Sequence, residues 1–244
     1  MSQEILTKRT GQVLEITLNR PDEGNGATDE MAAELIRLLG EAGDSSSLVV
    51  LRGAGRDFCI GRASMGRPRP AGPVEALERR RSTEVIFDCY GAFRRCPVPV
   101  IGVIQGRALG FGCALAGLCD ITLASDAATF QIPEMSHNIM PTMVMSALVD
   151  RVPRKALTYL VWSTAVISAE RALTAGIASE VVPAASLDAE VRKLCEALLK
   201  APRPALLAVK EYARAAPGMD IQGAVDFARN LHATINSSSE MRKK

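Results

Sequence analysis

The chain has 244 residues, of which 48% are hydrophobic and 23% are charged. These fractions are typical of ordinary globular proteins and exclude a disordered or fibrous chain. Lysine and arginine total 29 against 27 for aspartate and glutamate, so the net charge is only +2. That balance supplies no broad positive field, and we expect neither a nucleic-acid partner nor a membrane partner. The first residues, MSQEILTKRTG, lack the apolar run of a secretion signal, which favours a cytoplasmic location.

The first elements alternate between strand and helix. Val13 to Leu18 alternates apolar and polar residues, which predicts a strand. Thr28 is placed to cap a helix with apolar residues at helical spacing, and Gly40 is expected to end that helix. Leu48 to Arg52 is a nearly uniform apolar run, typical of a strand buried on both faces. The pattern predicts an α/β fold with a largely parallel sheet covered by helices.

The later segments continue this alternation and then become helical. A loop rich in Gly, Pro and Arg over residues 64–73 precedes a helix expected from Val74 to Phe93. From Val98 the pattern predicts a strand, a glycine turn, a short helix of small residues and a strand from Ile121 to Ala124. Beyond about Val144 helices dominate, one capped by Ser168 and another opened by Pro204.

Cysteine usage indicates neither disulfides nor a metal site. The six cysteines are scattered, form no CxxC pair and have mostly apolar neighbours: Cys59, Cys89, Cys96, Cys113, Cys119 and Cys195. We expect buried, reduced thiols and no bound metal.

Two segments place flexible backbone beside the start of a helix. One is Asp57 to Arg62 and the other is Gly106 to Cys113. Glycine allows a bare amide to approach a ligand, and a helix start adds positive partial charge, so together these segments can polarise an oxygen atom. The alternative interpretation is that the glycines only allow close helix packing.

Both segments occur in order with further motifs along the chain. Leu18-Asn19-Arg20-Pro21 precedes them, and they are followed by Cys119-Asp120-Ile121, Phe130-Gln131-Ile132-Pro133-Glu134 and Ala175-Gly176-Ile177-Ala178-Ser179-Glu180-Val181-Val182-Pro183. With this set of motifs the chain resembles the crotonase (enoyl-CoA hydratase/isomerase) superfamily from about Leu14 to Lys210.

The resemblance implies an architecture and a ligand. It implies a crotonase-like fold of repeated ββα units over residues 1–190 and a helical C-terminal trimerisation region over 191–244, hence a homotrimer or a hexamer built as a dimer of trimers. It also implies an acyl-CoA thioester as the ligand, with coenzyme A as part of the substrate and no separate cofactor. The backbone amides of Arg62 and Phe111 map onto the oxyanion hole, which stabilises a thioester enolate.

The carboxylates decide which reaction is implied. Hydratases of this family hold water between two glutamates; Glu134 matches one, but Ala114 stands where the other is found. A methyl group cannot transfer a proton, so the pattern favours an enoyl-CoA double-bond isomerase with Glu134 as the base. Two alternatives stay open: a hydratase or another lyase, in which His137, the substrate or water replaces the missing carboxylate, and a non-catalytic acyl-CoA-binding homologue.

Neighbouring residues carry three further expectations. Ile132, Met135, Ile139 and Met140 are expected to surround Glu134 with apolar atoms and so to raise its pKa. Asn138 stands where relatives have a glycine and is expected to adopt a left-handed conformation. Arg62 and Arg67, together with Arg69, are candidates to bind the coenzyme A phosphates, although a solvated charge run is an equal alternative.

Overall fold

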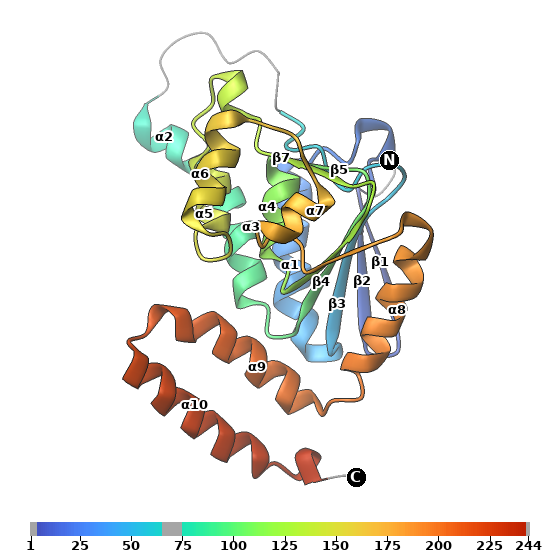
Figure 1. Ribbon diagram of the computed structural model, residues 1–244, viewed down its shortest axis with the longest axis vertical. Helices are drawn as coiled ribbons and strands as arrows, with labels where there is room; N and C mark the ends of the chain where they lie inside the picture. The colour runs from blue at the N-terminus through green and yellow to red at the C-terminus, as the bar shows by residue number, and fades with distance from the viewer. Residues whose placement is uncertain (1–3, 65–74, 243–244) are drawn as a thin grey trace.

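The structure, a computed structural model, describes residues 4–64 and 75–242 (Figure 1). Its larger sheet has six strands in the order β1-β2-β3-β4-β6-β9. Their bounds are β1 (Ile5–Thr10), β2 (Val13–Leu18), β3 (Leu48–Gly53), β4 (Val100–Ile104), β6 (Ile121–Ser125) and β9 (Glu180–Val182). The β1–β2 pair is antiparallel and the following pairs are parallel, which confirms the predicted α/β fold with a largely parallel sheet.

A smaller sheet collects three short strands at one end of the larger one. It contains β5 (Arg107–Leu109), β7 (Thr129–Gln131) and β8 (Ile167–Ser168), in that order. The chain leaves β4 for β5 and leaves β6 for β7, and each short strand leads into a helical turn: α4 (Phe111–Leu118) and η2 (Glu134–His137). These repeated ββα units therefore bring the starts of two helical segments to the same region.

Helices cover both faces of the large sheet (Figure 1). The main core lies under α1 (Asp29–Ser45), α3 (Glu84–Arg95), α4, α5 (Thr142–Leu148), α6 (Arg154–Ser163) and α7 (Ala169–Thr174). On the opposite face α8 (Leu187–Leu198) buries Val191 against Val50 and Val103. The middle strands are apolar throughout because both of their faces are covered.

Two predicted helix boundaries were wrong. Helix α1 continues through Gly40 to Ser45, because Ala42 is buried and Gly43 packs against the Pro97 ring. The helix expected from Val74 to Phe93 is instead α2 (Ala76–Arg81) followed by α3. The hydroxyl of Ser82 donates to Arg79 O at 2.8 Å, and such bonds compete with the helical ladder.

The last helices form a hairpin that projects from the core (Figure 1). It consists of α9 (Arg203–Ala215) and α10 (Ile221–Asn236). The buried Lys210 side chain fixes α9 by donating to Val98 O at 2.8 Å and pairing with Asp120 at 2.7 Å. The predicted boundary between the core and the C-terminal helical region, at residue 190, falls inside α8. Helix α8 packs on the sheet, and the projecting hairpin begins with α9.

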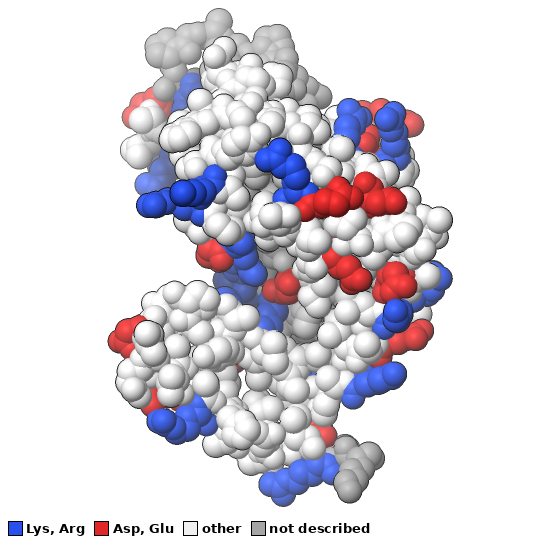
Figure 2. All heavy atoms as spheres, viewed as in Figure 1, with Lys and Arg blue, Asp and Glu red and all other residues white. Residues whose placement is uncertain are grey.

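The remaining helical turns are η1 (Pro21–Glu23), η3 (Ala184–Ser186), η4 (Ala216–Gly218) and η5 (Ser239–Arg242). Within the described ranges, no helix has the length and hydropathy needed to cross a membrane. On the face drawn in Figure 2, the hairpin surface is largely uncharged, and basic side chains gather in the hollow between the hairpin and the core.

Candidate active site

The two segments selected from the sequence lie side by side. Cys59 and Ala108 form an isolated parallel bridge, in which Cys59 N donates to Arg107 O at 3.1 Å and Leu109 N donates to Cys59 O at 2.9 Å. Gly112 completes the contact, because a Cβ at this position would overlap Cys59 O. Gly112 is therefore needed for the close approach of the two segments. This agrees with the interpretation that the glycines allow close packing. The same contact places the segment of Arg62 beside the segment of Phe111.

The Phe111 amide is the first N–H of α4. Gly110 precedes it with φ 49°, a left-handed value that favours glycine, and Gly110 N donates to Gln131 O at 2.9 Å. The first N–H groups of a helix have no partner within that helix, so the Phe111 amide is available to an anionic oxygen. The Arg62 amide lies in the other segment, beside the bridge that joins it to Ala27. Neither amide donates to the backbone of another residue in the ranges 4–64 and 75–242.

Glu134 is a buried carboxyl group at the start of η2. Its residue is 6% exposed, and its buried Oε2 atom has no hydrogen-bond partner among the described residues. Burial raises the pKa of Glu134 above its ordinary value, and a hydrogen bond from its own backbone partly offsets this shift. A buried acceptor without a partner is costly for stability, and such groups are characteristic of reactive sites.

Ala114, the position at which the second carboxylate is missing, lies in the core. Ala114 is fully buried on α4, one turn after Gly110, and its amide donates to Gly110 O at 2.9 Å. The neighbouring Cys113 lies within electrostatic range of Glu134, because the carboxylate contributes, after burial, to raising the pKa of Cys113 to about 12. Cys113 therefore brings an uncharged thiol of α4 near the Glu134 carboxyl group.

Tyr90 is a site residue that the sequence did not reveal. Its ring stacks on Phe111 with centroids 5.6 Å apart and an angle of 28° between the ring planes. Burial, followed by the charges of Cys89 and Glu134, raises the pKa of Tyr90 well above its ordinary value, so its hydroxyl stays protonated. Tyr90 lies on the buried face of α3 with Ile86 and Phe93 at helical spacing, a pattern that indicates only core packing.

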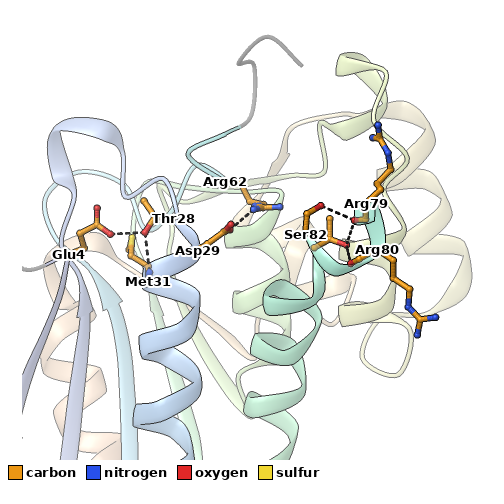
Figure 3. Close-up of polar contacts among 9 residues, drawn as sticks. Glu4, Thr28, Asp29, Met31, Arg62, Arg79, Arg80 and Ser82 are labelled. Atoms are coloured by element: carbon orange, nitrogen blue, oxygen red, sulfur yellow. Dashed lines mark hydrogen bonds and ion pairs between the residues drawn. The ribbon is translucent and has the colours of Figure 1, made fainter. Parts of the chain in front are cut away.

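The arginines predicted to bind coenzyme A differ in where they lie. Arg67 and Arg69 lie outside the described residues. The Arg62 guanidinium pairs with Asp29 at 2.5 Å, at the start of α1 (Figure 3). Arg79 and Arg80 of α2 point away from this pair (Figure 3).

His137 and Arg62 line the same pocket of about 390 Å³, together with Leu109, Pro133 and Ser136. His137 ends η2 and is exposed, whereas Glu134 at the start of the same turn is buried. The pocket lining thus combines a basic side chain and an imidazole, which suit an anionic or polar ligand group, with the acidic Glu23.

The surroundings expected for Glu134 are partly wrong. Ile132 is fully buried, but Met135 and Met140 are 44% and 72% exposed, so these methionines do not bury the carboxyl group. Met135 lies in η2 and Met140 lies beyond that turn, and Tyr90 and Cys113 lie near the carboxyl group instead. Asn138 has φ 54° and ψ 37°, which confirms the predicted left-handed conformation.

All six cysteines are buried and free, as predicted. Burial raises the pKa of Cys59 and Cys89 to about 12, as it does for Cys113. Within the described ranges, no group of three or more His, Cys, Asp or Glu side chains is arranged to hold a metal ion.

Comparisons with known proteins show the family and the fold of the chain. The family model for enoyl-CoA hydratase/isomerase matches residues 8–244. The human enoyl-CoA delta isomerase 2 is 32% identical over 215 residues, covering 86% of this chain and 54% of that protein. The crystal structure of an enoyl-CoA hydratase from Mycobacterium smegmatis has a TM-score of 0.90 at 26% identity, covering 98% of this chain and 93% of the other.

A second similar structure contains coenzyme A. It is a protein from Thermobifida fusca named as an enoyl-CoA hydratase, in complex with CoA, with a TM-score of 0.83 at 29% identity and coverage of 95% and 92% of the two chains. The chain belongs to the enoyl-CoA hydratase/isomerase family and has the crotonase fold. All three of these similar proteins are named for an enoyl-CoA substrate.

Proposed function

We propose that this protein is an enoyl-CoA double-bond isomerase in which Glu134 alone moves the proton. The observation that carries the proposal is the buried Glu134 carboxyl group, which has one oxygen without a partner among the described residues; Ala114 stands where hydratases of the family carry the second carboxylate. One carboxylate suffices to move a proton between two carbons of the same ligand, whereas oriented addition of water calls for a second acid or base.

The proposed reaction starts from a β,γ-unsaturated acyl-CoA. The Glu134 carboxylate takes a proton from the carbon next to the thioester, and the bonding electrons move onto the thioester oxygen, giving a dienolate. The amides of Arg62 and Phe111 donate hydrogen bonds to that oxygen. Glu134 then returns the same proton to the γ-carbon, and the double bond becomes conjugated with the thioester. No proton is gained or lost in the cycle, and the only coenzyme is the one carried by the substrate.

The raised pKa of Glu134 suits this role. A base that must accept a proton and then release it works best when its pKa lies nearer to the working pH than that of an ordinary carboxyl group. Burial supplies the shift, and the protonated Tyr90 hydroxyl adds no negative charge beside the carboxylate.

The test is a comparison of two substrates. The wild-type protein should convert a β,γ-unsaturated acyl-CoA to the conjugated product, followed by ultraviolet absorbance, and should hydrate crotonyl-CoA far more slowly. Glu134→Gln should lower the isomerisation rate about a hundredfold to ten-thousandfold. Glu41→Gln, which removes an exposed carboxylate of α1, is the matched control and should leave the rate unchanged.

Two results would replace this proposal by its alternatives. Efficient hydration of crotonyl-CoA would identify a hydratase and would direct attention to His137. Tight acyl-CoA binding without turnover of either substrate would identify a non-catalytic homologue.

We also propose a cytoplasmic homotrimer, or a hexamer made of two trimers. Supporting observations are Val209 on α9 and Ile221 on α10, which are 69% and 86% exposed, and a groove of about 350 Å³ with apolar walls between these helices. Exposed apolar area on this scale is typical of surfaces that a partner covers. Light scattering after size-exclusion chromatography measures the mass directly, and cell fractionation tests the location.

A further inference from the structure

Asp57 and Arg107 form a two-pronged ion pair beside the candidate active site, in which the carboxylate is buried and the arginine side chain is 48% exposed. Arg107 Nη2 lies 2.7 Å from Asp57 Oδ2 and Arg107 Nε lies 2.9 Å from Asp57 Oδ1. Arg107 N also donates to Asp57 Oδ1 at 3.0 Å. The Asp57 side chain is 5% exposed, and its charge is compensated mainly by the Arg107 guanidinium group, with a smaller contribution from Arg56.

The pair joins the two segments that carry the candidate oxyanion amides. Asp57 precedes the bridge residue Cys59, and Arg107 precedes the bridge residue Ala108. Arg62 follows in the first segment and Phe111 in the second. The pair therefore lies where both segments enter the site. The Asp57 carboxylate accepts hydrogen bonds from the backbone amide of Arg107 as well as from its side chain.

Both segments contain glycines in conformations that other residues rarely adopt. Gly61, Gly106 and Gly110 have φ values of 114°, 57° and 49°, in the region that favours glycine. The backbone pairing between the segments is short: Phe58 N donates to Gln105 O, Cys59 N to Arg107 O and Leu109 N to Cys59 O. A slip of one residue would move one amide about 3.3 Å relative to the other.

We propose that the Asp57–Arg107 pair is a positioning device that sets the spacing of the Arg62 and Phe111 amides. This inference rests on the proposed function, because it assigns the pair a role in stabilising the enolate oxygen. Neither side chain is assigned a contact with substrate; both act through the backbone that they hold.

Asn25 supports the same backbone from the other side. Its buried side chain donates to Asp57 O at 2.7 Å and to Ala54 O at 2.8 Å, and it accepts from Arg20 N. The first segment is thus held between Asn25 and Arg107. Hydrogen bonds from Arg107 keep the pKa of Asp57 below its ordinary value, so the pair stays charged at neutral pH.

The test uses three variants. Arg107→Lys keeps the charge but loses the planar fork. The double variant Asp57→Asn with Arg107→Gln replaces the ion pair by two amides, which avoids an isolated buried charge and so protects folding. Arg37→Gln is the matched control, because Arg37 also forks between carboxylates but does so on the exposed surface of α1.

Each variant is assayed by turnover and by ligand binding. Arg107→Lys and the double variant should lower kcat about tenfold to a hundredfold while KM changes less than about threefold, as expected for displaced catalytic groups. Binding of acetoacetyl-CoA, which forms an enolate with a near-ultraviolet absorbance band, should weaken more than binding of butyryl-CoA. Arg37→Gln should leave all of these values unchanged.

A structural role alone would lower the melting temperature without changing the ratio of the two ligand affinities. If the folded variants retain wild-type kcat and the wild-type affinity ratio, the positioning role is refuted. If wild type fails to isomerise any enoyl-CoA, the proposed function fails, but the affinity ratio still decides the role of the pair.

Discussion

The contact between Gly112 and Cys59 makes a sharp prediction for a one-carbon substitution. In Gly112→Ala the new Cβ would overlap Cys59 O and would lie 2.8 Å from Cys59 Cβ and 2.9 Å from the Cys59 carbonyl carbon. None of these atoms can be moved by a side-chain rotation, so the two segments must separate.

The size of the effect follows from these distances. Carbon atoms pack at about 3.5–4.0 Å, so relief requires a displacement of roughly 0.5–1 Å. Overpacking of this kind costs about 1–3 kcal/mol of stability. A displacement near 1 Å at a catalytic group costs about a hundredfold in rate, and we expect kcat/KM for isomerisation to fall by about 30- to 100-fold.

The assay compares Gly112→Ala with Gly40→Ala. A Cβ at Gly40 would meet no atom within 4 Å, and Gly40 lies inside α1. This control should gain about 1 kcal/mol from helix propensity and keep its rate. Circular dichroism confirms folding before rates are measured. A folded Gly112→Ala protein with a wild-type kcat/KM would show that the spacing of the segments does not control catalysis.

Three further outcomes are expected. Lys210→Met should lower the free energy of unfolding in urea by about 2–4 kcal/mol, because it strands the partly buried Asp120 carboxylate; a loss below about 0.5 kcal/mol would contradict this. Thr164→Gly should raise stability by about 0.5–1 kcal/mol in thermal melts, since Thr164 has φ 49°, whereas Asn138→Gly should change it less. Burial raises the folded-state pKa of Glu134, so its contribution to stability is present below its ordinary pKa of 4.5 and is lost as pH rises. Glu134→Gln should therefore be more stable than wild type at pH 8, and the difference should vanish near pH 4; equal stability at both pH values would contradict burial of the charge.

The architecture and the motif positions were predictable because they depend on local pattern. The apolar run of β3, the cap at Ser168 and the left-handed Asn138 each follow from the residue and its neighbours. The absence of a carboxylate at Ala114 is visible in the sequence itself. Such features need no knowledge of what lies across the fold.

Features that depend on contacts between distant segments were not predictable. Gly40 stands at an apparent helix end, but packing of Gly43 against Pro97 keeps the helix intact. Arg62 looks free in the sequence, yet Asp29 pairs with its guanidinium group. Tyr90 and the Asp57–Arg107 pair carry no local signal, because their partners lie far away along the chain.

The buried thiols have a chemical consequence for an enzyme that makes conjugated thioesters. Such products are electrophiles that alkylate thiolates by Michael addition, and Cys59, Cys89 and Cys113 lie in the segments that form the site. With a pKa of about 12, each of these thiols is ionised to only about one part in 10⁵ at pH 7. Under the proposed function, the sulfur atoms near the conjugated product are therefore held as thiols, the form that resists alkylation.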